Sequence, residues 1–318
     1  MKPVVTTTAD APVTGRPELH VRELPRGIDP RFIASLASVY LVWSSTYLGV
    51  RVAVETMPPL MMCSARFLAA GLVMLGVARH RGAKLPPWRD WLAVAPAGLT
   101  LFIGGTGFVA LAEVSVSSGG AAVVCATMPL WVGVLGIFFG ERPTAREWLT
   151  LVVGFAGVFI LMDGPSLSGR PEHIVLIIVS PICWALGSLL SRRTKGIGGP
   201  QAALVVPGVQ MLMGGVVLLV IALGRGEPLP IHASARSWLA LAYLVVFGSL
   251  VAFTGYAWLL RNARPVVATS YAYVNPVIAV LLGAALYGEP LGWTTLVANI
   301  LIVGAVMLAL MRPRLATP

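Results

Sequence analysis

Long apolar runs recur along the whole chain and constrain its fold more than any other feature. Each is about twenty residues long, enough for a helix to cross the roughly 30 Å hydrocarbon layer of a membrane. Hydrophobic residues occupy 57% of the 318 positions and charged residues only 11%, whereas soluble domains carry about 25% charged residues. Because no water satisfies backbone polar groups inside a bilayer, such runs must form helices. The sequence therefore predicts an all-α integral membrane protein.

The apolar runs and the short polar segments between them predict ten transmembrane helices. The expected helices are residues 31–54, 59–78, 90–112, 117–139, 145–162, 172–192, 201–223, 237–261, 266–287 and 293–311. Residues 1–30 are polar and contain Pro and Thr, so we expect a disordered cytoplasmic tail there and not a cleaved signal peptide. Residues 312–318 are expected to form a second cytoplasmic tail.

The distribution of basic residues predicts how these helices are oriented. With a cytoplasmic N-terminus, 18 of the 23 Lys and Arg residues fall in cytoplasmic segments. The loops on the other side then hold only Arg51, Arg170, Arg225 and Arg236. Cytoplasmic loops carry an excess of Lys and Arg, so both termini are expected in the cytoplasm. Because the basic residues lie in short loops between apolar runs, the net charge of +10 is not taken as a sign of nucleic-acid binding.

The two halves of the chain share residues in the same order. The matched pairs, 141 to 148 residues apart, are Trp43 with Trp184, Arg51 with Arg192, Pro59 with Pro200, Trp91 with Trp238, Pro129 with Pro276, and Gly140-Glu141 with Gly288-Glu289. We therefore expect two repeats of five helices, residues 31–162 and 172–311. Because five is odd, the second repeat starts on the opposite side of the membrane and has inverted topology. Inverted repeats place a substrate site near the bilayer midplane.

Three stretches of the sequence carry a recognisable family pattern. They read YLVWSSTYLGVRVAVETMPPLMMCSARFLAAGLVML (40–75), ATMPLWVGVLGIFFGE (126–141) and TSYAYVNPVIAVLLGAALYGE (269–289). The pattern resembles the EamA domain, the repeat of the drug/metabolite transporter superfamily, over about residues 31–311. It departs from the family at Ser44, where the first helix usually has Gly after Trp. The resemblance implies a ten-helix bacterial inner-membrane carrier that exports amino acids, metabolites or drugs, with a cavity between the first, third, fourth, sixth, eighth and ninth helices.

Polar and aromatic side chains at mid-depth of four expected helices are the candidates for a substrate pathway. They are Trp43, Ser45, Thr46 and Tyr47 on the first helix, Trp184 and Ser188 on the sixth, Thr254 and Tyr256 on the eighth, and Tyr271 and Asn275 on the ninth. Aromatic faces beside polar atoms suit an amphiphilic ligand. The alternative is that these side chains serve helix packing and interhelical hydrogen bonds. Pro129 and Pro276 lie inside helices and are expected to kink them.

Four charged residues are candidates for gates or ion pairs. Arg66 lies about 10 Å inside the second helix at 1.5 Å per residue, where a charge needs a partner or a path to water. Glu113 is the expected partner, and contact with an anionic substrate group is the alternative. Glu141 and Glu289 each precede a helix, where a carboxylate caps the N-terminus or serves as a gate.

The remaining residue types indicate no chemistry beyond transport. None of the 13 Asp and Glu residues lies at mid-depth of an expected helix, so proton coupling through a central carboxylate is not expected. The three cysteines have no metal-site spacing, and no nucleophile, histidine and acid share one depth. We therefore expect no metal, no cofactor and no enzymatic activity.

The sequence thus predicts a secondary transporter in a bacterial inner membrane that exports small neutral or zwitterionic metabolites, or amphiphilic drugs. Residues 31–162 are expected to rock against residues 172–311 in alternating access. The alternative is a membrane sensor or assembly subunit that binds a ligand without moving it. The sequence does not predict the oligomeric state.

Overall fold

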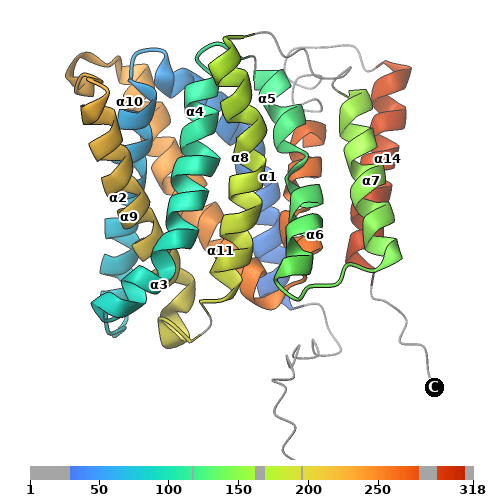
Figure 1. The fold of residues 1–318 in the computed structure, drawn as a ribbon, viewed down its shortest axis with the longest axis horizontal. Helices are drawn as coiled ribbons and strands as arrows, with labels where there is room; N and C mark the ends of the chain where they lie inside the picture. The colour runs from blue at the N-terminus through green and yellow to red at the C-terminus, as the bar shows by residue number, and fades with distance from the viewer. Residues whose placement is uncertain (1–28, 117, 162–168, 195, 279–291, 312–318) are drawn as a thin grey trace, which may run out of the picture.

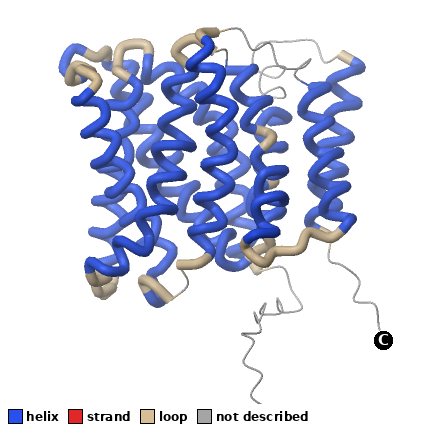
Figure 2. Tube along the Cα trace, in the orientation of Figure 1, coloured by secondary structure: helices blue, strands red, loops and turns tan. Residues whose placement is uncertain are grey.

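The computed structural model describes residues 29–116, 118–161, 169–194, 196–278 and 292–311. Within these ranges all regular secondary structure is helical, and the helices stand side by side in one bundle (Figures 1 and 2). The expected all-α class is confirmed for this part of the chain.

The first half of the chain forms the elements from α1 to α7. They are α1 (Pro30–Val54), α2 (Pro59–His80), α3 (Trp88–Leu99), η1 (Thr100–Gly107), α4 (Phe108–Ala112), α5 (Ser118–Cys125), α6 (Met128–Phe138) and α7 (Ala145–Leu161). The eight residues of η1 are π-helical and join α3 to α4 in one continuous rod. Thr144 and Glu147 form a capping box at the start of α7, with the Thr144 amide 2.8 Å from Glu147 Oε2.

The second half of the chain forms the elements from α8 to α14. Its elements are α8 (Pro171–Arg192), η2 (Gly199–Gln201), α9 (Ala202–Gly224), η3 (Pro230–His232), α10 (Ala235–Tyr243), η4 (Leu244–Val251), α11 (Ala252–Asn262), α12 (Pro265–Thr269), a helical segment 271–278, and α14 (Trp293–Leu310). As in the first half, an eight-residue π-helical segment, η4, interrupts the rod formed by α10 and α11.

Seven helices of the described ranges are long and apolar enough to cross a membrane. They begin at Pro30, Pro59, Trp88, Pro171, Gly199, Ala235 and Trp293. The other three expected helices, 117–139, 145–162 and 266–287, fall on shorter or interrupted helices, or extend into residues outside the described ranges. A multi-span membrane protein is therefore supported, whereas the number ten, the inverted repeats and the side of each terminus stay predictions.

The expected helix 117–139 is divided in two just before Pro129. α5 ends at Cys125 and α6 begins at Met128, which places Pro129 in the first turn of α6. Proline is tolerated there because its missing N–H would have no partner in a first turn. The expected helix 266–287 is interrupted by a turn at Ser270, and Pro276 lies inside the helical segment 271–278 that follows.

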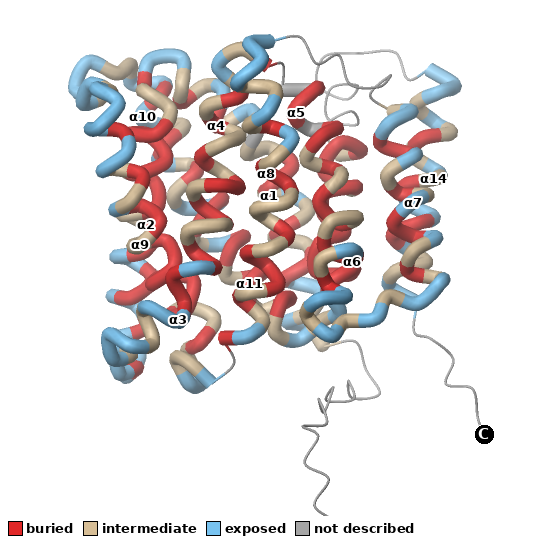
Figure 3. The backbone as a smooth tube through the Cα atoms, viewed as in Figure 1, coloured by how far each residue is buried: buried red, intermediate tan, exposed pale blue. Residues whose placement is uncertain are grey.

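The helices of the two sequence halves interleave. α2 packs along α9 at the left side of the bundle in Figure 1, and α7 packs along α14 at the right side. Between them, α1 packs against α10 and α11, and α8 packs against α3, η1 and α4. Buried and exposed stretches alternate along the helices, and the loops at the top and bottom of the bundle are mostly exposed (Figure 3). Large apolar side chains such as Phe138, Trp293 and Ile300 are more than two-thirds exposed, as expected of surfaces that face lipid.

Glycines bring α2 and α9 into close contact. A Cβ placed on Gly71 would lie 2.8 Å from Leu212 Cγ and 2.9 Å from the carbonyl oxygen of Gly208. On α9, Gly208 in turn leaves room for Leu75. Small residues at such contacts allow the backbones of membrane helices to approach each other, which is how helices associate in lipid.

We expect Gly71→Ala to lower the melting temperature of the purified protein in detergent. The added methyl meets backbone atoms that cannot rotate away, and overpacking of this kind costs about 1–3 kcal/mol. The control is Gly76→Ala on the same helix, because a Cβ at Gly76 has open space around it. Alanine is the better helix former, so this control should match or exceed the wild type. Equal melting temperatures for the two variants would contradict the close packing of α2 and α9.

Candidate substrate pathway

A cavity of about 110 Å³ lies between helices of both sequence halves. Its walls come from α1, α2, η1, α4, α5 and α6 of the first half and from α8, α11 and the segment 271–278 of the second. Most of the wall is apolar or aromatic, and none of the described residues that line it is acidic. The volume is below the roughly 300–1,000 Å³ of typical ligand pockets, so a metabolite-sized ligand requires the helices to move apart.

Four of the ten predicted pathway residues line this cavity. They are Trp43, Thr46, Trp184 and Tyr271. The rings of Trp43 and Trp184, which are equivalent residues of the predicted repeats, meet edge to face with their centroids 5.6 Å apart and their planes at 85°. The ring of Tyr271 also packs against that of Trp43, with their centroids 4.6 Å apart. The sequence halves therefore meet at the cavity through these rings.

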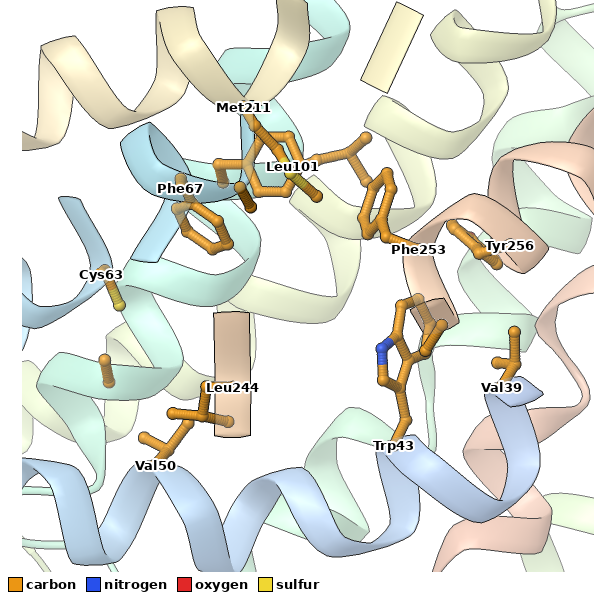
Figure 4. Close-up of a cluster of buried hydrophobic side chains, with 14 of the residues drawn as sticks. Val39, Trp43, Val50, Cys63, Phe67, Leu101, Met211, Leu244, Phe253 and Tyr256 are labelled. Atoms are coloured by element: carbon orange, nitrogen blue, oxygen red, sulfur yellow. The ribbon is translucent and has the colours of Figure 1, made fainter. Parts of the chain in front are cut away.

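Phe253 and Tyr256 of α11 complete the aromatic cluster (Figure 4). The ring of Tyr256 lies 5.0 Å from that of Trp43 and 5.6 Å from that of Tyr271. The rings of Tyr256 and Tyr271 meet edge to face at 89°, whereas those of Trp43 and Tyr256 are tilted at 55°. An edge-to-face pair contributes about 0.5–1.5 kcal/mol beyond its buried area. Trp43, Trp184, Phe253 and Tyr271 of this cluster line the cavity, and Tyr256 packs against all four rings.

The two π-helical segments hold the tryptophans in place. The Trp43 indole N–H donates to the carbonyl oxygen of Gly248 in η4 at 2.9 Å. In η1, Gly105 gives room to the Trp184 ring and its carbonyl accepts a hydrogen bond from Ser180 Oγ at 2.9 Å. A π-helical turn shifts the backbone pairing and is frequent at functional sites, which accounts for carbonyl groups that accept bonds from another helix.

Tyr256 and Ser188 lie behind the cavity wall. Tyr256 is fully buried, and its hydroxyl is 2.6 Å from Ser188 Oγ and 3.3 Å from the Trp184 indole nitrogen, which donates to it. Ser188 also donates to the Trp184 carbonyl within α8 at 2.7 Å. These two predicted pathway residues therefore position Trp184 and do not line the cavity themselves.

The other described pathway candidates, Ser45, Asn275 and Thr254, do not line the cavity. Ser45 Oγ is 2.5 Å from the Tyr243 hydroxyl of α10, and Asn275 Oδ1 accepts from Ser44 Oγ at 3.1 Å. Thr254 donates to a carbonyl of its own helix at 2.6 Å. The bonds of Ser45 and Asn275 fit the alternative expectation of interhelical hydrogen bonding, whereas that of Thr254 stays within its own helix. The side chain of Tyr47 lies outside the described structure.

Arg66 lines the cavity and is not paired with Glu113. Its side chain is 7% exposed, and Nε donates to Ser249 Oγ in η4 at 2.8 Å. Both carboxylate oxygens of Glu113 are buried and have no hydrogen-bond partner among the described residues. The expected ion pair is therefore absent from this part of the structure, because η4 supplies Arg66 with a partner on α10–α11 instead.

Glu141 forms an ion pair and does not cap α7. Its Oε1 lies 3.2 Å from Arg192 at the end of α8, and Arg192 also donates to the carbonyls of Leu260 and Ala263. The cap of α7 is the Thr144–Glu147 box, so the capping interpretation of Glu141 was wrong. Glu289, its predicted counterpart, lies outside the described residues.

A second ion pair joins the sequence halves near the first. Glu147 Oε2 lies 2.6 Å from Arg264, which directly precedes α12. Both pairs are at the end of the bundle where α1 begins (Figure 1). At the opposite end, Glu55 and Arg236 form a longer and more exposed pair at 3.8 Å. An exposed ion pair contributes little to stability. The two closer pairs therefore stabilise the contact between the halves more at the end where α1 begins.

The sequence interpretation missed several cavity residues because they are purely apolar or small. Phe67, Phe102, Phe253 and Met128 line the cavity but have no polar atom to set them apart from ordinary packing residues. Ser44 and Tyr40 were also missed. Ser44 stands where the family usually has Gly and donates to Asn275, and the Tyr40 hydroxyl is 2.6 Å from Ser270 Oγ. For Ser44, its departure from the family pattern was the one feature of the sequence that could have indicated this contact.

The model of the EamA-like transporter family matches this chain twice, over residues 32–163 and 172–311. The chain belongs to this family. As a member it is a membrane transporter, and its cavity lies between the two segments that match.

Named relatives agree with this assignment. YedA of Escherichia coli K12, described as an uncharacterized inner membrane transporter, is 44% identical over 276 residues, covering 86% of this chain and 89% of YedA. YvbV of Bacillus subtilis 168, an uncharacterized transporter, is 26% identical and covers 91% of this chain and 93% of its own length. PecM of Dickeya dadantii 3937 is 26% identical over 84% of this chain and 88% of PecM.

A solved crystal structure shares the fold of this EamA-family chain. It is 21% identical, has a TM-score of 0.72, and covers 88% of this chain and 97% of its own. At this identity the likeness concerns the fold alone.

We expect Tyr256→Phe and Ser188→Ala to be coupled in a double-mutant cycle. Removing the tyrosine hydroxyl leaves the Ser188 hydroxyl and the Trp184 indole N–H short of a partner, at about 1–3 kcal/mol. The double variant should lose less thermal stability in detergent than the sum of the single variants. The control combines Tyr256→Phe with Thr254→Val, which shares no partner with it, and should be additive. Additive losses in both cycles would contradict the bonding around Tyr256.

Proposed function

We propose that this transporter works by alternating access and exports small metabolites or amphiphilic drugs across a bacterial inner membrane. The proposal includes ten transmembrane helices in two inverted repeats with both termini in the cytoplasm. The twofold family match, the matched residue pairs and the π-helical segments in the third helix of each half all support an internal duplication. The inner membrane is supported by the description of YedA.

The observation that carries the proposal is the edge-to-face contact of Trp43 and Trp184 at the cavity. The two rings occupy equivalent positions in the two family matches, so they lie on either side of the expected twofold axis. Inverted repeats place their substrate site where such an axis crosses the bilayer midplane. A cavity walled by both repeats at this point suits a site exposed first to one side and then to the other.

The moving units we infer are pairs of helices and not the two sequence halves. The most extensive contacts in the bundle, α2 with α9 and α7 with α14, join the two halves, as do those of α1 with α10 and α11 and of α8 with α3 and α4. Sliding residues 31–162 as one body past residues 172–311 would break these contacts. Tilting one of these mixed groups against the other preserves them. The Glu141–Arg192 and Glu147–Arg264 pairs would then open on one face as the Glu55–Arg236 pair tightens on the other.

The aromatic and uncharged character of most of the cavity wall sets the class of substrate. Among the described lining residues, Arg66 is the one charged side chain, so multiply charged solutes would lose their hydration without compensation. A small neutral or zwitterionic metabolite, or an amphiphile with an apolar body, fits this wall.

We expect Tyr271→Ala to impair transport and Tyr273→Phe to leave it intact. Tyr271 lines the cavity, whereas the hydroxyl of Tyr273, two residues later, donates to the Leu151 carbonyl on α7 at 2.9 Å. The measurement is uptake of a mixture of radiolabelled amino acids into inverted vesicles, with and without a pH gradient. For the transported solute, the half-saturating concentration should rise about tenfold or more in Tyr271→Ala, as for the loss of a stacking contact of about 1.4 kcal/mol.

Two outcomes would count against this function. Uptake with unchanged affinity in Tyr271→Ala would discard the pathway through the cavity. Saturable binding of solutes without accumulation in vesicles would favour a sensor that binds a ligand and does not move it.

A further inference from the structure

Arg66 is a buried cation that faces the cavity. It belongs to α2, is 7% exposed and lines the cavity wall. Nε donates to Ser249, and the guanidinium carbon lies 5.2 Å from the ring centroid of Phe67. The contacts of the described residues leave the two terminal NH₂ groups without a hydrogen-bond acceptor. Four N–H donors of a charged group are therefore available to a ligand in the cavity.

The scaffold does not require an arginine at this position. Pro59 and Pro200 correspond in the two repeats, and by the same offset Arg66 corresponds to Pro207 in α9. A charge inside a membrane protein is expensive and is retained mostly where it is used. The ion pairs among the described residues do not include Arg66, and both carboxylate oxygens of Glu113 lack a hydrogen-bond partner there. Among the described residues, the burial of this charge is offset only by the hydrogen bond to Ser249 and the contact with the Phe67 ring.

The surroundings of Arg66 define the rest of the ligand. The cavity wall contains the rings of Phe67, Phe102, Trp43 and Trp184 and no described acidic residue. A ligand that fits this wall has an apolar or aromatic body and an anionic group at one end. A positively charged ligand would meet a like charge and would find no acidic partner among the described lining residues.

We propose that Arg66 binds the carboxylate of the transported solute, so that the substrates are small monocarboxylates with an apolar or aromatic body. A planar guanidinium matches a carboxylate through two parallel N–H···O bonds. One arginine balances one negative charge, which favours a monocarboxylate over a phosphate dianion. Ser249 holds the group in place by accepting a hydrogen bond from Nε. This inference rests on the proposed transport function and names its substrate class.

The test uses three probes of one shape that differ in charge. They are 3-phenylpropanoate, its neutral amide 3-phenylpropanamide, and the cation 3-phenylpropylamine. Binding to the purified full-length protein in nanodiscs is followed by quenching of tryptophan fluorescence, to which Trp43 and Trp184 of the cavity contribute. The carboxylate should bind about tenfold or more tighter than the amide, and the amine should bind weakest.

The decisive variant is Arg66→Gln, with Arg79→Gln as its matched control. Arg79 lies on the same helix but is exposed and outside the cavity. Arg66→Gln should bind the carboxylate and the amide equally, while Arg79→Gln keeps the preference of the wild type. Arg66→Lys should retain part of the preference, because it keeps the charge without the planar fork. If Arg66→Gln fails to fold, Ser249→Ala serves instead and should weaken carboxylate binding while sparing the amide.

Several results would overturn the proposal. They are an equal affinity of the wild type for carboxylate and amide, a preference that persists in Arg66→Gln, and an absence of binding by all three probes at millimolar concentration. A protein that binds carboxylates but does not transport them would give a different combination of results. In that case the carboxylate preference would depend on Arg66 in nanodiscs, yet no probe would accumulate in vesicles.

Discussion

The contacts of Trp43 join the parts of this protein that form its cavity. Its indole N–H bonds to the Gly248 carbonyl of η4, and its ring meets Trp184 of α8, Tyr256 of α11 and Tyr271 of the helical segment 271–278. In a membrane, burial of apolar area does not drive helices to associate, since lipid is equally apolar. Directed contacts such as these, together with glycines that admit close approach, must hold the bundle in one arrangement. Trp43 supplies several of them at once and leaves a space beside its ring.

Much of the fold followed from the sequence because the bilayer leaves few choices. Long apolar runs can only be helices, and the helix ends mostly fall within a few residues of the polar segments that bound them. The breaks before Met128 and at Ser270 and the two π-helical segments were not predicted. In the two π-helical segments, backbone carbonyls accept hydrogen bonds from side chains of neighbouring helices. Gly248 and Gly105 show this, since each carbonyl accepts from a residue that is distant in sequence.

The site was predictable only in part for a related reason. Aromatic residues with a repeat counterpart, Trp43 and Trp184, were found because the duplication marked them. Polar residues such as Ser45 and Asn275 were chosen for their chemistry, yet their bonds go to Tyr243 and Ser44. Arg66 was recognised as needing a partner, but the partner proved to be Ser249 and not Glu113. Depth in a helix can be estimated from sequence, whereas the facing helix is set by packing between halves that interleave.

The central claim is that one cavity, walled by both repeats, opens alternately to the two sides of the membrane. The most direct measurement places a single cysteine at Thr46, which lines the cavity, in a protein whose native Cys63, Cys125 and Cys183 are replaced by alanine. A membrane-impermeant maleimide is then applied to right-side-out and to inverted vesicles. Labelling from both sides at comparable extent is the predicted result. Labelling confined to one side, or to neither, would contradict the account.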